Sequence, residues 1–156
     1  MIIKKSDASH WEIKTKLTKI TLDDGVTIGE FKIPGNGEYE IKEIEAEVTD
    51  GIYIFDVEDM NIVFIDKLKK TLSPEEIKKI EDSNILFIPI SGKETMDTKT
   101  ALSYINTIEP EIVIPIFYDD LLTLTKSEGS KITEMEELKI AKSDINAEER
   151  KTIILK

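Results

Sequence analysis

Two short apolar stretches separated by a helix-like segment constrain the fold of this chain most. Residues 85–90 (ILFIPI) and 112–116 (IVIPI) are apolar throughout, as is the earlier stretch 62–65. Strands that are buried on both faces have this composition, and they are typical of parallel sheets. The segment 97–109, between the stretches 85–90 and 112–116, carries apolar residues at helical spacing and ends before a proline. The pattern predicts a right-handed βαβ unit.

The first 65 residues follow a different rule, because apolar and polar residues alternate with the period of two that half-buried strands require. Turn signals rich in Asp and Gly separate these stretches, at residues 23–25, 34–37 and 49–51. No helical periodicity of useful length occurs before Ser73. The predicted short strands lie at residues 11–13, 20–22, 26–28, 31–33, 39–41, 44–48 and 52–54.

The remaining elements complete a single domain over residues 1–156. A helix is expected to start at Ser73, because Ser can cap it, Pro74 suits the first turn and the glutamates that follow favour the positive end of its dipole. A short helix is expected over 119–126. Closing strands are expected near 132, 138–140 and 152–155, and they are expected to form a final hairpin. The sequence predicts an α/β protein with a nearly all-β N-terminal half and a βαβα C-terminal half plus closing strands.

Composition excludes several classes of partner. The formal charge of −11 repels phosphate backbones, so neither nucleic acid nor an anionic membrane is expected as the main partner. No apolar run approaches the roughly 18–20 residues that span a bilayer, and the N-terminus lacks the apolar core of a signal peptide. Because the chain has no cysteine, nothing indicates an oxidising compartment, and a cytoplasmic location is expected.

Metal and acid–base chemistry have few candidate residues. Zinc sites take three or four His, Cys or carboxylate ligands, mostly nitrogen and sulfur, and this chain offers one histidine and no cysteine. His10 could serve as a general base, but no nucleophile has a spacing that supports this, and a structural or exposed role is favoured. Two groups of acids could bind a hard cation, although solvated turns are the favoured interpretation: Asp56, Glu58 and Asp59, and Asp119 with Asp120.

Four stretches in a fixed order resemble the metallo-β-lactamase fold superfamily, particularly small bacterial metal-dependent hydrolases similar to ascorbate-6-phosphate lactonase. Residues 35–41 (GNGEYEI) are similar to GPGEYEV of that family, and 84–92 (NILFIPISG) to DVLFVPVGG. Residues 95–97 (TMD) with Ala101 are similar to TMDA, and 109–116 (EPEIVIPI) to KPKVVIPM. More weakly, residues 9–13 (SHWEI) resemble the opening GHSCF strand. The resemblance implies a reduced αββα sandwich.

The departures from this family fall on its metal ligands. The loop His-x-His-x-Asp-His has no counterpart, and the segment that would hold it is absent between Leu22 and Pro34. The family's HLGDL is matched by residues 64–68 (FIDKL), which puts Phe64 and Lys67 at ligand positions. The final histidine, after the IPM motif, is matched by Phe117. Phenylalanine cannot coordinate and an ammonium repels cations, so the resemblance implies a form without its metal ligands.

A remaining pocket, if one exists, is expected where these strand ends converge. It would be lined by Lys67, Ser91, Gly92, Lys93, Thr95 and Tyr118. The loop 91–95 lies between a strand and a helix, where amides can hold a phosphate, but it lacks the first glycine of a Walker A loop. A plain turn with a cap at Thr95 or Asp97 is favoured. An ion pair between Asp66 and Lys67 is expected to replace the charge of the metal.

Two functions follow as hypotheses. The first is a non-catalytic protein without cofactor that acts through a protein partner or self-association, because a half-deleted sandwich should expose apolar sheet surface. The alternative is a hydrolase or small-molecule binder with a rebuilt, zinc-free site at the C-terminal ends of the strands. The loss of ligand positions favours the non-enzymatic hypothesis.

Overall fold

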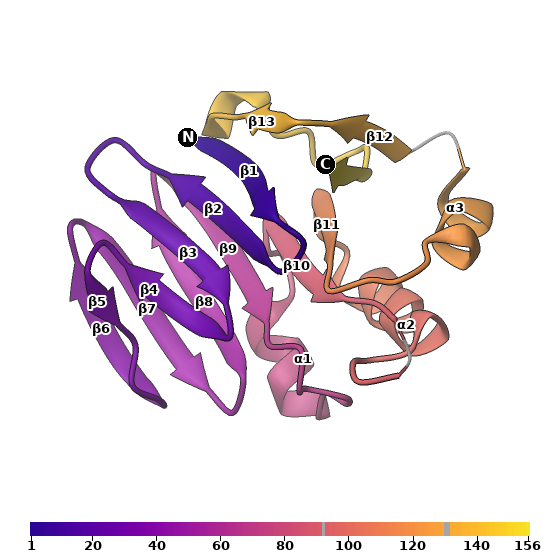
Figure 1. The fold of residues 1–156 in the computed structure, drawn as a ribbon, viewed down its shortest axis with the longest axis horizontal. Coiled ribbons are helices and arrows are strands. Elements are labelled where there is room, and N and C mark those ends of the chain that lie inside the picture. The colour runs from indigo at the N-terminus through magenta and orange to yellow at the C-terminus, as the bar shows by residue number, and fades with distance from the viewer. Residues whose placement is uncertain (92, 130–131) are drawn as a thin grey trace.

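Two β-sheets pack face to face in the computed structural model, which describes residues 1–91, 93–129 and 132–156. Within these residues, a six-stranded sheet has the order β13-β1-β2-β3-β4-β5, and an eight-stranded sheet has the order β12-β14-β11-β10-β9-β8-β7-β6. Figure 1 looks onto the first sheet, with the second sheet behind it and the helices at one side. The arrangement is the predicted α/β sandwich.

The first sheet is antiparallel and comes almost entirely from the N-terminal segment. Its strands are β1 (Ile2–Asp7), β2 (His10–Lys14), β3 (Lys19–Asp23), β4 (Gly25–Ile28), β5 (Phe31–Lys32) and, from the far end of the chain, β13 (Glu137–Lys139). The predicted alternation holds in β2 and β3, where every second side chain is buried. β1 was not predicted, because Ile3 is its only buried residue and the alternation is missing.

The second sheet is mixed. Its strands are β6 (Gly37–Ile41), β7 (Ile44–Thr49), β8 (Ile52–Val57), β9 (Met60–Ile65), β10 (Ile85–Pro89), β11 (Ile112–Ile116), β12 (Ile132–Met135) and β14 (Lys151–Leu155). β6 to β9 form an antiparallel meander, and β9, β10, β11, β14 and β12 pair in parallel. The predicted parallel βαβ unit is therefore confirmed, and β10 and β11 are buried along their whole length.

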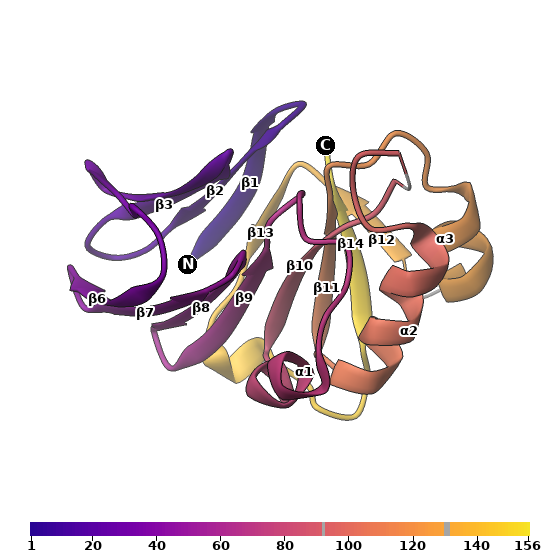
Figure 2. The same ribbon diagram turned by 90° about the horizontal axis from the view of Figure 1, so that it is seen from below.

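Helices cover only part of the second sheet. α1 (Pro74–Ile80), α2 (Thr98–Ile108) and α3 (Leu122–Glu128) lie against the half formed by β9, β10, β11 and β14 (Figure 2). Of the helices in the described residues, only α1 reaches the meander β6–β8, where it borders one end of β7 and β8. A further 3₁₀ turn spans Lys142–Asp144. Caps define the helix ends as predicted: Ser73 forms a capping box with Glu76, Asp97 caps α2, and Glu109 ends it in the left-handed conformation.

Two expectations about the sheets were wrong. The closing strands form no hairpin, because β13 crosses to pair with β1 while β12 and β14 pair in parallel. The outer face of the first sheet is also not apolar: Glu12, Lys14, Lys19 and Thr21 point away from the buried side chains of β2 and β3. This face therefore needs no helix to cover it, because polar side chains already meet the solvent.

The buried residues form two layers. One lies between the two sheets and contains the large aromatic residues Trp11, Phe55, Phe64 and Phe87. The other lies between the second sheet and the helices, and is built from aliphatic side chains such as Val63, Leu86 and Ile105. Among the described residues, no helix is long and apolar enough to cross a membrane.

Candidate functional site

The predicted former ligand positions Phe64 and Phe117 lie together at one edge of the sandwich. Phe64 is near the end of β9 and is fully buried, whereas Phe117 directly follows β11 and is half-buried. Their ring centroids are 6.4 Å apart. Trp11 from β2 meets Phe117 edge-to-face at 5.0 Å, a favourable aromatic geometry. An aromatic cluster thus joins the two sheets at this edge.

The backbone at Phe117 adopts an unusual conformation. Its φ angle is 50°, in the left-handed region that bulky residues rarely enter. Such residues cost about 1–3 kcal/mol and persist only where the surroundings hold them in place. Contacts of the Phe117 ring with both Trp11 and Phe64 supply that restraint here.

Lys67 covers the outer side of this cluster. Its Nζ lies 5.6 Å from the centroid of the Phe117 ring and forms an ion pair with Asp24. The hydrogen bond with Asp24 raises the pKa of Lys67, and the same contact lowers the pKa of Asp24. The predicted pair of Asp66 with Lys67 was wrong in its partner, because the Asp66 carboxylate instead accepts a hydrogen bond of 2.9 Å from the Leu68 amide.

His10 lies at the rim of the same edge and is 40% exposed. Its Nδ1 is 2.6 Å from Asp7 and its Nε2 is 3.4 Å from Asp23. The hydrogen bond with Asp7 is the main reason why the pKa of His10 is raised, and nearby carboxylate charge adds to it. Ser9 approaches the same Nδ1 at 3.3 Å. A nucleophile and an orienting acid must use opposite ring nitrogens in a catalytic triad, so this arrangement is not one.

The residues predicted to line a remaining pocket make contacts of a structural kind. The Thr95 hydroxyl donates to Ser91 Oγ at 3.1 Å, and Lys70 Nζ donates to the carbonyl oxygens of Lys93 at 3.4 Å and Thr95 at 3.5 Å. Tyr118 donates to the Leu155 carbonyl at 3.4 Å. Gly92, which was also predicted, lies outside the described residues.

Several residues of this edge were not predicted from the sequence. Lys5 places its ammonium 5.5 Å from the Trp11 ring and 4.9 Å from the Tyr118 ring, and Lys70 holds the 93–95 backbone. The sequence predicts Asp24 only as part of a turn. These contacts join segments far apart in the sequence, so no local sequence motif predicts them.

Most of the acidic residues considered as ligands for a hard cation form hydrogen bonds or an ion pair with other groups of the protein. Asp56 accepts a hydrogen bond of 3.1 Å from Asn61, Glu58 is 3.6 Å from the N-terminal amine, and Asp120 accepts from the Leu122 amide at 2.9 Å. In the part of the chain that the structure describes, no three His, Cys, Asp or Glu side chains are grouped so that they could hold a metal ion.

The comparison with protein families agrees with this architecture. The model of the beta-lactamase superfamily domain matches residues 2–117, which is most of the chain. The chain belongs to the beta-lactamase superfamily. The resemblance seen in the sequence is thereby confirmed. No curated protein is similar enough in sequence to count as a match.

Two solved structures share the fold at low sequence identity. A proposed Zn-dependent hydrolase of the metallo-β-lactamase superfamily from Thermotoga maritima is 16% identical, with a TM-score of 0.85 over 99% of this chain and 98% of that one. A metallo hydrolase from Ignicoccus hospitalis is also 16% identical, with a TM-score of 0.54 over 72% of this chain and 62% of that one. The reduced sandwich is therefore an architecture that this chain shares over its whole length with the Thermotoga protein.

The residues at this edge do not fit the zinc that the superfamily implies. Phe64 and Phe117 have no donor atom, and Lys67 brings a positive charge that Asp24 already neutralises. The buried Trp11 indole nitrogen is a hydrogen-bond donor only and cannot coordinate a cation. We therefore derive no chemical step through a metal at this edge.

Proposed function

We propose that this chain is a non-catalytic member of its superfamily that acts by contacting another protein or another copy of itself. The observation that carries the proposal is the packing of Phe64, Phe117 and Trp11 at the edge where the resemblance places metal ligands. Aromatic side chains at these positions stabilise the contact between the sheets, and they supply neither a Lewis acid nor a nucleophile.

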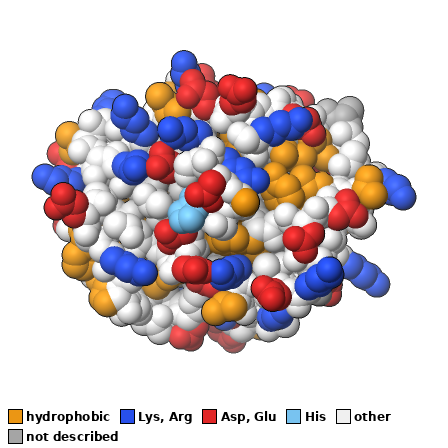
Figure 3. All heavy atoms as spheres, viewed as in Figure 1, with side chains coloured by type: hydrophobic (Ala, Val, Ile, Leu, Met, Phe, Trp, Pro, Cys, Tyr) orange, Lys and Arg blue, Asp and Glu red, His pale blue; other side chains and the backbone are white. Residues whose placement is uncertain are grey.

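Exposed apolar side chains support an interaction role. Leu68 follows β9 and is 72% exposed, and Leu122 at the start of α3 is 64% exposed. On the face seen in Figure 3, apolar side chains gather in a patch between β11, β12 and α3. Contiguous exposed apolar surface marks sites that bind other proteins, membranes or ligands.

The alternative function, a hydrolase or small-molecule binder with a rebuilt zinc-free site, has weaker support. The hydroxyl groups of Ser91 and Thr95 bond each other, and Tyr118 donates to a backbone carbonyl. These groups satisfy each other rather than converge on a common ligand position. A cytoplasmic location likewise stays a prediction from the lack of cysteine.

Metal analysis of the purified protein tests the proposal. We expect far less than one equivalent of any transition metal per chain, and a melting temperature that neither EDTA nor added Zn²⁺ changes. A metal bound at 100 times its dissociation constant would stabilise the fold by about 2.7 kcal/mol, so a real site would be visible in this assay. Stoichiometric, tightly bound metal would overturn the proposal.

A variant that restores ligands provides the positive control. Phe64→His, Lys67→Asp and Phe117→His together return the residue types that the family has at these positions. We expect Zn²⁺ to raise the melting temperature of this triple variant while leaving the unmodified protein unchanged. If the substitution at the buried Phe64 prevents folding, the pair Lys67→Asp and Phe117→His, at the less buried positions, replaces the triple variant. A variant that folds but whose melting temperature does not change with Zn²⁺ would contradict the assignment of these residues to former metal-ligand positions.

A further inference from the structure

Lysines dominate one end of the outer face of the first sheet. Lys14 in β2 stands directly opposite Lys19 in β3, and Ile2 of β1 lies opposite Lys14 on the other side. A hollow of about 590 Å³ on this face is lined by four lysines and only two glutamates. We call this the basic face; its lysines are Lys4, Lys14, Lys16 and Lys19. Lys4 and Lys19 already pair with Glu12, at 3.5 and 2.9 Å. Among the described residues no ion pair involves Lys14 or Lys16, so these two lysines are the ones that a negatively charged partner would meet.

An exposed leucine lies at the end of the basic face, in a turn that borders Glu43, Glu58 and Asp59 on its other side. Leu17 is 55% exposed and lies in the turn between β2 and β3, beside Lys16. Thr15 Oγ1 accepts hydrogen bonds from the amides of Leu17 at 3.3 Å and Thr18 at 3.0 Å, and the Thr15 amide donates to the Thr18 carbonyl at 2.8 Å. The turn therefore holds the leucine in place before any partner arrives, which lowers the entropic cost of binding.

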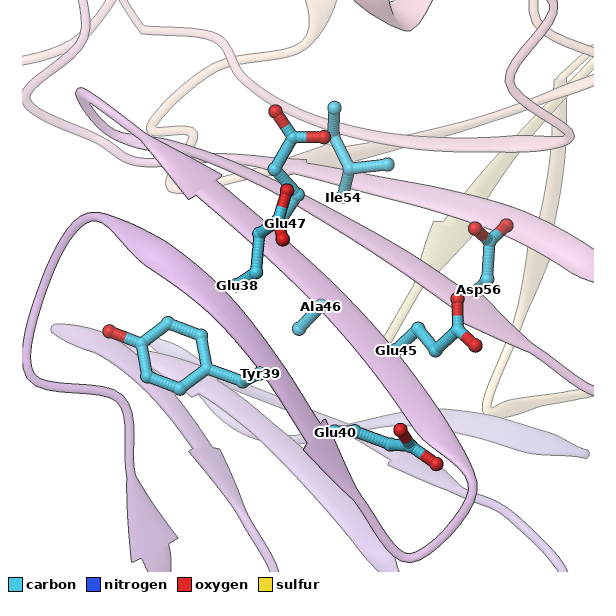
Figure 4. A pocket seen from close by; sticks show the side chains of 8 residues that line it. All are labelled: Glu38, Tyr39, Glu40, Glu45, Ala46, Glu47, Ile54 and Asp56. Carbon is cyan, nitrogen blue, oxygen red and sulfur yellow. The ribbon is translucent and has the colours of Figure 1, made fainter.

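The outer face of β6–β8 has the opposite charge. Three cross-strand pairs on this face place carboxylates opposite one another: Glu38 with Glu47, Glu40 with Glu45, and Glu45 with Asp56. They surround a hollow of about 390 Å³, and Figure 4 shows Glu38 beside Glu47 and Glu45 beside Asp56. We call this the acidic face. Within the described residues no helix lies over this hollow (Figure 2). Lys79 of α1 pairs with Glu47 at its edge, whereas Glu38, Glu40 and Glu45 are exposed to solvent.

An apolar notch adjoins the acidic face where the strands meet α1. Ile52 and Ile54 of β8 line this notch of about 150 Å³, and Glu47 and Ile54 belong to both the notch and the acidic face. Glu75, Glu76 and Lys79 of α1 form its other side. The notch therefore offers apolar surface to an exposed leucine. Glu47 and Glu76 at its rim already pair with Lys79 and Lys69, so the lysines of the basic face would meet the exposed carboxylates of the adjoining acidic face.

We propose that a second copy of this chain docks its basic face on the acidic face and inserts Leu17 into the notch beside Ile52 and Ile54. This inference specifies the partner in the proposed function and rests on it. The two faces lie on opposite sides of the sandwich (Figure 2), so the contact is heterologous. Each complex leaves one face free at either end, and assembly continues beyond the dimer.

Charge reversal of each face tests the contact. In sedimentation velocity at about 20 mM NaCl, where screening is weak, we expect the average mass to rise with concentration, and to fall to that of the monomer at about 0.5 M. Lys14→Glu/Lys16→Glu and Glu40→Lys/Glu45→Lys should each weaken association at least tenfold. Mixed together, the two variants should form a complex, because each keeps the face that the other lost. Leu17→Ser should also weaken association at least tenfold without changing net charge.

Controls separate the contact from net charge and folding. Lys99→Glu/Lys126→Glu changes net charge as much as the basic-face variant but lies on α2 and α3, and should associate almost like the parent chain. If a reversal variant does not fold by circular dichroism, the corresponding glutamine variants replace it. A monomer under all conditions, a closed dimer, or association indifferent to these variants would overturn the inference. Metal analysis is independent of mass, so failure of the proposed function would be recognised separately.

Discussion

His10 gives direct experimental access to the edge that carries the aromatic cluster. It is the only histidine of the chain, so its Hε1 proton gives a single histidine signal in an NMR titration. Because its hydrogen bond with Asp7 raises the pKa, we expect a midpoint above the ordinary value of 6.5. Asp7→Asn should move the midpoint back toward 6.5. A midpoint at or below 6.5 in the parent chain would show that the contact does not persist in solution.

The same pair predicts how stability depends on pH. A raised pKa of His10 means that its contribution to the free energy of unfolding is complete below 6.5 and is lost as pH rises through the folded-state pKa. The pKa of Asp7 is lowered, first by the Ser9 amide and then by His10, so its contribution disappears as pH falls below 3.8. Urea unfolding should therefore show a larger difference between the parent and His10→Gln at about pH 5.5 than at about pH 8.5. Equal differences would contradict the linkage.

If Phe64 replaces a metal ligand with a core side chain, its removal should destabilise the fold. Its side chain is fully buried and contacts the rings of Tyr53 and Phe117. Phe64→Ala should lower the free energy of unfolding by about 3–5 kcal/mol, as buried phenylalanines do. Phe31→Ala, at a position 44% exposed, is the matched control, and we expect a loss of about 1 kcal/mol or less. Urea denaturation measures both, and comparable losses would mean that the cluster is not a core.

At the level of elements, the start of α1 depends on one side chain. Ser73 Oγ accepts from the Glu76 amide at 3.2 Å, and the Glu76 carboxylate accepts from the Ser73 amide at 2.9 Å. Ser73→Ala removes half of this capping box and should cost about 1 kcal/mol. Ser103→Ala, on the exposed side of α2, should be neutral or slightly stabilising because alanine is the better helix former. Urea denaturation of the two variants checks the difference.

These elements also show which parts of the fold the sequence makes visible. α1 and α2 could be predicted because Ser73 and Asp97 cap them through hydrogen bonds to residues only three positions further along the chain. β10 and β11 were visible because both faces are buried. β1 was not visible, and the closing strands were predicted at the right places but with the wrong pairing, because β13 pairs with β1, more than 130 residues away. Local patterns contain no information on such pairing.

At the edge with the aromatic cluster, too, some features could be predicted from the sequence and others depend on long-range contacts. Phe64, Lys67 and Phe117 could be singled out through resemblance, and the structure brings Phe64, Lys67 and Trp11 together around Phe117. The partner of Lys67 could not, because Asp24 lies 43 residues away in the chain and the nearer Asp66 was the obvious candidate. Asp66 instead caps its own turn, a local bond that short acidic side chains readily make.

For the whole molecule, the places where negative charges lie close together affect the stability of the fold more than the net charge does. A net charge of −11 destabilises the compact state through self-repulsion. Part of that repulsion is concentrated on β6–β8, where Glu45 stands opposite both Glu40 and Asp56. The proposed contact would place lysines against these carboxylates and so relieve their repulsion.

Neutralising Glu45 separates local from overall repulsion. Glu45→Gln relieves two cross-strand contacts and should raise the free energy of unfolding by up to about 1 kcal/mol in dilute, monomeric protein at low salt. Glu136→Gln, exposed between β12 and β13, removes the same formal charge without such a pair and should raise it less. The two variants should converge at about 1 M NaCl, where the Debye length falls to about 3 Å. Equal stabilisation at low salt would mean that net charge alone governs stability, and that the acidic face carries no local strain for a partner to relieve.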